Sequence, residues 1–209
     1  MANKLAIVGA GGHAKVVLDA ALLMNRWHDI VFLDDAAQGE LLGYPILGNS
    51  HLLGTRLLPS EYDVVIAIGN NVIRAQHLQR AEQLGFTLPT ILHPTATLSR
   101  FAQLQQGSVV FAHAVVNAAA QVGKGAIINT AATIDHDCIL GDYVHISPAA
   151  HLGGNTRVGD YSWLGIGCST RHGSTIGSHC LIGAGATVIQ DIANHTTAIG
   201  TPAQPLQKD

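Results

Sequence analysis

The second half of the chain carries an aliphatic residue at every sixth position, and this period restricts the fold more than any other feature. From Leu98 to Val188, fifteen of the sixteen residues at this spacing are aliphatic, and Thr170 is the exception. An α-helix repeats its apolar face every ~3.6 residues and an ordinary strand every second residue. A fixed period of six is typical of a hexapeptide β-helix, in which stacked repeats bury a shared core.

A small residue stands two positions before each of these aliphatic residues from Ala102 onward, and we expect both positions to face a narrow core. Cys138, Cys168 and Cys180 all occupy the small position, so we interpret them as buried thiols rather than as disulfide partners, zinc ligands or nucleophiles. Glycine and asparagine near the corners are expected to supply backbone conformations that a Cβ disfavours. The repeat runs without a slip, so catalytic residues must sit on the repeats themselves.

The first half of the chain alternates strand and helix patterns, which favours a small parallel sheet of Rossmann type. Strands are predicted at residues 5–9, 29–33, 62–68 and 87–92, with helices running to about residue 24 and from about 72 to 84. The predicted organisation is a Rossmann-like α/β domain over residues 1–92, followed by an all-β parallel β-helix over residues 93–209.

A glycine-rich turn follows the first predicted strand and suggests a ligand that contains phosphate. Gly9-x-Gly11-x-x-Ala14 fits the relaxed dinucleotide fingerprint. Asp34 follows about 20 residues later in the sequence, where such domains carry the acidic residue that binds a ribose hydroxyl. The domain is too short for a complete dinucleotide sheet, so a mononucleotide or the diphosphate of a nucleotide sugar fits better. A tight turn without a ligand remains the alternative.

The composition restricts the classes of partner that we expect for this chain. The net charge is −3 with 12% charged residues, which gives no electrostatic reason to expect nucleic acid or an acidic membrane surface. No signal-peptide pattern and no segment of about 20 apolar residues is present. We expect a cytoplasmic protein without membrane insertion.

His136 stands out among the twelve histidines because it lies between Asp135 and Asp137 at a predicted corner. An adjacent carboxylate can fix the tautomer of an imidazole and raise its basicity. On spacing alone, a solvated surface histidine is an equally good interpretation.

Six stretches together resemble one family, the bacterial sugar O- and N-acyltransferases of the hexapeptide-repeat superfamily, of the bacillosamine-pathway and sialic acid type. They are residues 9–15, 32–35, 66–71, 129–130, 134–138 and 200–203. The resemblance implies a left-handed β-helix, an acetyl-CoA-dependent enzyme, a homotrimer and a nucleotide-sugar acceptor held by the N-terminal domain. It implies no metal.

The resemblance also implies roles for individual residues. His136 matches the general base, and Asp137 matches a supporting acidic residue that is usually the longer Glu, so a water could stand between the two. His145 matches a histidine near the thioester carbonyl, where it could stabilise the oxyanion. The implied acetyl-CoA contacts are His145, Ile166 and Ala184. The implied acceptor contacts are Gly11, Gly12 and His13 at the diphosphate, Asp34 and Asp35 at uridine, and Gly69.

The period adds a geometric expectation. Three repeats make one coil of eighteen residues, and His136 and His145 are nine residues apart, so they should lie on opposite parts of a coil. If both serve one reaction, they must come from neighbouring subunits.

We therefore predict N-acetylation of a nucleotide-linked 4-amino-4,6-dideoxy sugar, with UDP as the favoured carrier. The alternatives are O-acetylation of a sialic acid or another sugar, a zinc enzyme of the γ-carbonic anhydrase kind using His136, His145 and His151, and a nucleotide-sensing scaffold without catalysis.

Overall fold

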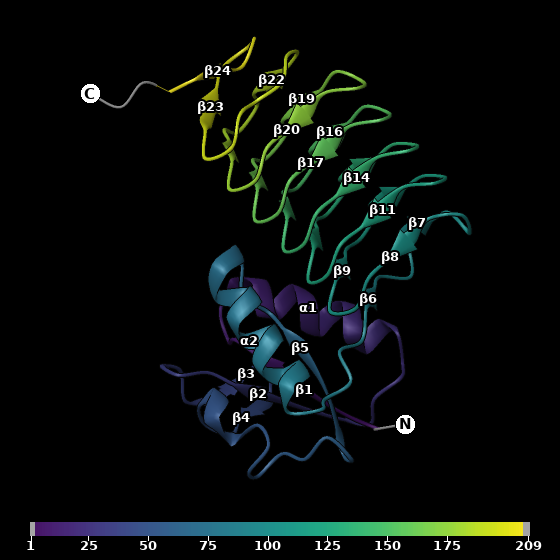
Figure 1. The fold of residues 1–209 in the computed structure, drawn as a ribbon. Coiled ribbons are helices and arrows are strands. Elements are labelled where there is room, and N and C mark those ends of the chain that lie inside the picture. The colour runs from purple at the N-terminus through teal and green to yellow at the C-terminus, as the bar shows by residue number, and fades with distance from the viewer. Residues whose placement is uncertain (1–2, 207–209) are drawn as a thin grey trace.

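The computed structural model describes residues 3–206, which form an α/β domain followed by a long solenoid (Figure 1). The α/β domain has a five-stranded sheet in the order β3-β4-β2-β1-β5. Strands β1, β2 and β5 are parallel, as predicted, and β3 and β4 form an antiparallel hairpin at one edge. The strands are β1 (Lys4–Val8), β2 (Asp29–Leu33), β3 (Gly39–Leu41), β4 (Tyr44–Ile46) and β5 (Tyr62–Ile66).

The helices of this domain are α1 (Gly12–Leu23) and α2 (Asn71–Gln83), and a single 3-10 turn covers Ser50–Leu52. The expected fourth strand over residues 87–92 is wrong for the α/β sheet. Only Ile91–Leu92 forms a strand, β6, and it pairs with β9 in the solenoid. The solenoid therefore already begins at Ile91.

The solenoid has three faces, each a parallel sheet of very short strands, and the fold class expected from the six-residue period is confirmed. Residues eighteen apart pair across neighbouring coils, as Ile127 does with His145. The first face contains β6 (Ile91–Leu92), β9 (Val109–Val110), β12 (Ile127–Ile128), β15 (His145–Ile146), β18 (Trp163–Leu164), β21 (Leu181–Ile182) and β23 (Thr197–Ile199), with β24 (Gln204–Pro205) antiparallel at its end.

The second face contains β7 (Thr97–Leu98), β10 (Val115–Val116), β13 (Thr133–Ile134), β16 (His151–Leu152), β19 (Ser169–Thr170) and β22 (Thr187–Val188). The third contains β8 (Gln103–Leu104), β11 (Gln121–Val122), β14 (Ile139–Leu140), β17 (Arg157–Val158) and β20 (Thr175–Ile176). The chain visits the three faces in this order, so each coil has three corners, which we name by the two faces they join.

The solenoid core contains both sets of residues that the period assigns to it. Most of the aliphatic residues and the apolar small residues, including all three cysteines, are buried in one cluster, and Leu98, Ala102 and Leu104 are partly buried against it. Burial raises the pKa of Cys168 to about 12, so this thiol stays protonated. Thr170 interrupts the aliphatic series because its hydroxyl accepts a hydrogen bond from the Gly153 N–H at 3.1 Å and pairs with the Thr156 hydroxyl at 2.9 Å.

The glycines that follow the aliphatic positions serve close packing rather than unusual backbone angles. A Cβ on Gly123 would lie 2.5 Å from the carbonyl oxygen of Gly141 in the next coil. The left-handed backbone angles occur instead three residues after the repeat positions from Leu104 to Ile182, and most of these residues are not glycine; Asp137 has φ 58°. The expectation that glycine and asparagine supply unusual backbone angles at the corners therefore holds for residues such as Gly125 and Asn155, but not for the glycines that directly follow the aliphatic positions.

The two domains pack through α1 and α2, which cover opposite faces of the α/β sheet and both contact the solenoid (Figure 1). Phe111 and Ile127 of the solenoid share a buried cluster with α1, and Tyr143 shares one with α2. No helix of residues 3–206 is long and apolar enough to cross a membrane.

Candidate active site

A buried arginine joins the α/β domain to the solenoid. The Arg74 guanidinium donates to the carbonyl oxygens of Gly125 and Tyr143, both at 2.7 Å, and to that of Gly69 at 2.9 Å. Asn71, one turn earlier on α2, accepts from Arg74 and donates to the Tyr161 carbonyl at 2.8 Å. No carboxylate among residues 3–206 forms an ion pair with Arg74, so this cation is stabilised by carbonyl dipoles alone.

Two histidines meet where α1 contacts the first face. His13 lies near the start of α1 and packs edge-on against Phe111, with ring centroids 5.4 Å apart. His145 lies on β15 and stacks on Trp163 of the next coil, with centroids 4.6 Å apart and an interplanar angle of 16°. The His13 and His145 centroids are 6.4 Å apart, so one chain brings these two predicted site residues together.

Both imidazoles are neutral near pH 7. Burial, with a smaller contribution from the Arg74 charge, lowers the pKa of His13 to about 4 and that of His145 to about 3. His145 Nε2 lies 3.3 Å from Asn129 Nδ2, whereas His145 Nδ1 and His13 Nε2 are buried without a hydrogen-bond partner in the described chain. Buried polar atoms of this kind are usually satisfied, so these two nitrogens are candidates for a hydrogen bond with a ligand or a water.

His136 lies at the corner between the second and third faces, just after β13. Its Nδ1 contacts Asp137 Oδ2 directly at 2.8 Å, so the shorter carboxylate needs no bridging water. The left-handed backbone of Asp137 turns the chain at this corner. The hydrogen bond that His136 donates to Asp137, followed by the charge of Asp135, raises the pKa of His136. Asp135 accepts from the His136 N–H at 2.8 Å and from Asn117 at 2.9 Å, which fixes the corner.

The His136 ring lies against Gly154 of the next coil. A Cβ on Gly154 would come within 2.6 Å of Cε1 and Nε2 of the ring. With Nδ1 bound to Asp137, Nε2 is the ring nitrogen left to accept a proton, and the side chain is 56% exposed. This arrangement presents an oriented base to solvent.

The predicted site residues are divided among different corners of the solenoid. His136 lies between the second and third faces, and His145 lies on the opposite first face. Ile166 and Ala184 follow β18 and β21, so both lie between the first and second faces, and the Gly185 N–H donates to the Ile166 carbonyl. Within one chain, the candidate base is thus separated from His145 and from the candidate acetyl-CoA contacts.

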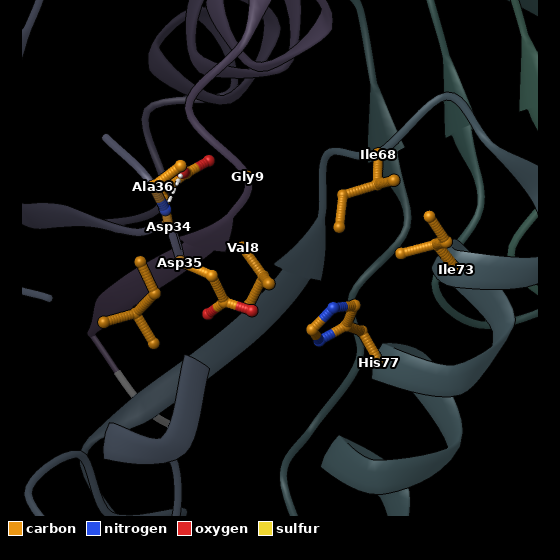
Figure 2. A pocket seen from close by; sticks show the side chains of 9 residues that line it. Val8, Gly9, Asp34, Asp35, Ala36, Ile68, Ile73 and His77 are labelled. Carbon is orange, nitrogen blue, oxygen red and sulfur yellow. Dashed lines mark hydrogen bonds between the residues drawn. The ribbon is translucent and has the colours of Figure 1, made fainter. Parts of the chain in front are cut away.

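A pocket of about 180 Å³ opens at the carboxyl ends of β1 and β2 (Figure 2). Its walls are mostly apolar, and polar groups come from the end of β2 and from α2. The lining residues are Val8, Gly9, Leu33, Asp34, Asp35, Ala36, Ile68, Ile73 and His77. Ligands of parallel α/β sheets bind at this edge.

The two aspartates predicted to bind the nucleoside have different environments. Asp34 accepts from three backbone N–H groups, those of Ala10 at 2.7 Å, Ala36 at 2.9 Å and Ala37 at 2.8 Å. Its carboxylate therefore holds the glycine-rich turn in place. Asp35 Oδ1 accepts from the N–H and the hydroxyl of Ser50 at 3.0 and 3.1 Å, and its Oδ2 takes no part in these bonds.

The glycines of the predicted diphosphate turn are exposed at the start of α1. Gly11 is the N-cap residue and has no side-chain cap, so the first N–H groups of the helix face outward near Gly12. Gly9 is required for a different reason, because its φ is 105° and a Cβ would lie 2.8 Å from the Ala67 carbonyl oxygen. Gly69 contributes its carbonyl to Arg74.

Sequence reasoning missed Arg74 and His77. The buried face of α2 consists of Asn71, Arg74, Ala75, Leu78 and Ala81, which follow helical spacing. A charged residue at a position of the buried face was the signal for Arg74. His77 carried no comparable signal, because only the folded sheet brings α2 opposite the end of β2.

Within the described residues, no group of three or more His, Cys, Asp or Glu side chains could hold a metal ion. His136 lies at a corner after β13, His145 lies on β15 of the first face and His151 lies on β16 of the second face, so the three histidines do not converge.

Two family descriptions match this chain. Residues 4–81 match the PglD N-terminal domain, and residues 155–190 match the bacterial transferase hexapeptide of six repeats. A curated relative, the UDP-N-acetylbacillosamine N-acetyltransferase of Bacillus subtilis (strain 168), is 36% identical over 116 residues, which are 53% of this chain and 52% of the relative. The chain thus spans about half the length of the curated relative it matches.

Solved structures match over nearly the whole chain. The acetyltransferase domain of PglB from Neisseria gonorrhoeae FA1090 is 50% identical, with 98% of this chain and 100% of that chain covered and a TM-score of 0.97; that domain is also known in complex with acetyl coenzyme A. PerB from Caulobacter crescentus, in complex with CoA and GDP-perosamine, is 35% identical, with 98% and 97% covered and a TM-score of 0.92. The chain belongs to the hexapeptide-repeat sugar N-acetyltransferases that begin with a PglD-type N-terminal domain.

Proposed function

We propose that the protein transfers the acetyl group of acetyl-CoA to the 4-amino group of a nucleotide-linked 4-amino-4,6-dideoxy sugar. The observation that carries this proposal is the His136–Asp137 pair, in which a carboxylate at 2.8 Å orients an exposed imidazole whose pKa is raised. The N-acetyltransferase activity of the B. subtilis relative and the CoA and GDP-perosamine bound to the C. crescentus protein support the same class of acceptor.

In this reaction the sugar nitrogen attacks the thioester carbonyl directly, and no enzyme nucleophile is needed. Nε2 of His136 takes the proton that the nitrogen loses as the N–C bond forms. The C–S bond then breaks, and the CoA sulfur leaves and takes up a proton. Asp137 keeps Nδ1 protonated and so leaves Nε2 as the acceptor.

The site combines two subunits of a homotrimer. His136 of one chain faces the first face of its neighbour, where a neutral His145 can donate to the carbonyl oxygen as negative charge develops. Ile166 and Ala184 of that neighbour bind the CoA through backbone groups. The separation of these residues on different corners of one chain supports a shared site. The acceptor is held by Gly11, Gly12, His13, Asp35 and Gly69, in a cytoplasmic protein.

Release of free CoA thiol tests the proposal. Wild-type protein is incubated with acetyl-CoA and a panel of UDP-, dTDP- and GDP-linked 4-amino sugars, with a sialic acid as the alternative acceptor. A nucleotide-linked amino sugar should be acetylated and the sialic acid should not. His136→Ala should lower kcat by about 10²-fold or more with little change in acetyl-CoA binding. Preferential acetylation of sialic acid, or near-normal turnover by His136→Ala, would refute the proposal.

A further inference from the structure

The corner between the third and first faces presents backbone carbonyl groups that the stacking of the coils does not use. Gly125, Tyr143 and Tyr161 occupy equivalent positions in three successive coils, and their φ angles of 57, 58 and 59° are all left-handed. No backbone N–H of residues 3–206 donates to these three carbonyl oxygens. Where α2 covers this corner, the carbonyls need donors from the helix, because a buried carbonyl without a partner is costly.

Two side chains of α2 supply the donors. Arg74 Nε donates to the Gly125 carbonyl and Arg74 Nη2 to the Tyr143 carbonyl, both at 2.7 Å. Asn71 Nδ2 donates to the Tyr161 carbonyl at 2.8 Å, and Asn71 Oδ1 accepts from Arg74 Nη2 at 2.8 Å. These two residues lie one helical turn apart and together contact three successive coils, so they fix the register of α2 along the solenoid.

The same contacts hold the peptide unit that leads into His145. The Val144 carbonyl accepts from Arg74 Nη2 at 3.2 Å. The His145 N–H donates to the Ser162 carbonyl at 2.9 Å, and this carbonyl also accepts from Asn71 Nδ2 at 3.3 Å. Both ends of the Val144–His145 peptide are therefore linked to α2, and the position of the helix sets the position of the His145 side chain.

At its other end, the Arg74 guanidinium holds the loop between β5 and α2. Nη1 donates to the carbonyls of Ile68 and Gly69 at 3.0 and 2.9 Å. Asn70 in this loop caps α2, because its side chain accepts from two backbone N–H groups of the first turn. One planar group, 1% exposed, therefore joins the Gly69 loop to the backbone of His145.

We propose that Arg74 is a positioning residue for acetyl transfer, which holds the Gly69 loop at a fixed distance from His145. The proposal rests on the proposed function, in which Gly69 contacts the acceptor and His145 lies at the thioester carbonyl. Direct attack of the sugar nitrogen needs both substrates in one geometry, and a displacement of about 1 Å can cost about 10²-fold in rate. Arg74 is buried and acts only through the backbone of these two segments.

Lysine at this position separates geometry from charge. A guanidinium offers five N–H groups in fixed directions, whereas an ammonium offers three from a single atom. Lysine therefore cannot replace contacts that three separate nitrogens of Arg74 make. The Arg74 charge contributes, after burial, to the low pKa of His145. Arg74→Lys keeps this charge, so a loss of activity in this variant reports lost geometry.

The experiment measures kcat and KM for the nucleotide-linked amino sugar that the wild type acetylates best. Binding of CoA, followed by isothermal titration calorimetry, gives the CoA affinity and counts the competent sites. Arg74→Lys should lower kcat per competent site about 10²-fold and raise the acceptor KM about 10-fold. Its CoA affinity should stay within about twofold of the wild type, because the proposed CoA contacts, Ile166 and Ala184, lie at another corner of the solenoid.

Two further variants test the assignment. Asn71→Ala removes the donors to the Tyr161 and Ser162 carbonyls on the solenoid side but none to Gly69. It should lower kcat about 10-fold and leave the acceptor KM within about twofold of the wild type. Arg80→Lys, the same substitution at a half-buried position of α2, is the control and should match the wild type in all three constants.

A purely structural role for Arg74 predicts a different result. Fewer sites would bind CoA, while kcat per site and the acceptor KM would match the wild type. That result, or a wild-type kcat in Asn71→Ala, would overturn the proposal. Where Arg74→Lys does not fold, Asn71→Ala decides through the same constants. Failure of the proposed function appears in the wild type instead, which would then acetylate no nucleotide-linked amino sugar, and the inference would fail with it.

Discussion

Gly154→Ala should disable the candidate base without disturbing the fold. Gly154 occupies the position two residues after an aliphatic residue of the repeat. The equivalent residues elsewhere include Asp142, Asp160, Ile166 and His172, so the solenoid accepts side chains at this position. The backbone of Gly154 is not left-handed, so alanine causes no strain there. Glycine is needed at this place because the His136 ring lies against it.

The size of the effect follows from the geometry. The added Cβ would lie 2.6 Å from Cε1 and Nε2 of His136, whereas ordinary contacts begin at 3.4 Å, so the ring must move by nearly 1 Å. A displacement of that size in a catalytic group can cost about 10²-fold in rate. The ring is exposed and can move outward, so we expect kcat to fall about 10²-fold while the thermal midpoint stays within about 2 °C.

The assay is steady-state release of CoA thiol, together with a thermal melt of each protein. Ser178→Ala, at the same repeat position but on the corner between the third and first faces, should have wild-type kcat and serves as the control. A Gly154→Ala protein with unchanged kcat and an unchanged melt would show that the orientation of His136 does not matter for turnover.

Three further predictions concern pH and stability. Asp137→Asn removes the largest cause of the raised His136 pKa, so the acid limb of kcat/KM, where the neutral imidazole forms, should move to lower pH; an unmoved limb in a profile from pH 5.5 to 9 contradicts this. Arg74→Met leaves the carbonyls of Gly125 and Tyr143 without their buried donor and should lower the thermal midpoint by about 10 °C, whereas Arg80→Met on the same helix should have little effect. Thr170→Val restores the aliphatic series but leaves the Gly153 N–H unpaired, so melting should occur about 5 °C lower; a stabilised variant would contradict the role of the hydroxyl.

The sequence was sufficient for the solenoid because its period is a direct consequence of stacking. Each aliphatic residue and each small residue faces the same core, and a one-residue slip would expose the whole series. The pairing of His136 with a carboxylate could also be predicted, since Asp137 is adjacent in the chain, although the two side chains are in direct contact at 2.8 Å without the water that we expected between them. Local contacts of this kind need no knowledge of the tertiary fold.

Contacts between distant segments were not accessible in the same way. The pairing of His13 with His145 and the placement of His77 opposite Asp35 depend on how α1 and α2 dock on the first face. The strand at Ile91–Leu92 was assigned to the wrong sheet because a two-residue apolar segment fits either domain. Asp34 fits a ribose-binding pattern, but only its three backbone partners reveal that it stabilises the turn.

Mixing two variants provides the sharpest test of the proposed homotrimer with sites shared between chains. His136→Ala and His145→Ala proteins should each be nearly inactive alone, because each lacks one of the two histidines at every site. When equal amounts are unfolded and refolded together, a site is complete only if it takes His136 from one variant and His145 from the other. In randomly assembled trimers with cyclic symmetry, about one quarter of the sites meet this condition. Recovery to about one quarter of the wild-type rate is therefore expected. If both histidines served a site within one chain, no mixture could contain a complete site, and activity would stay at the level of the single variants.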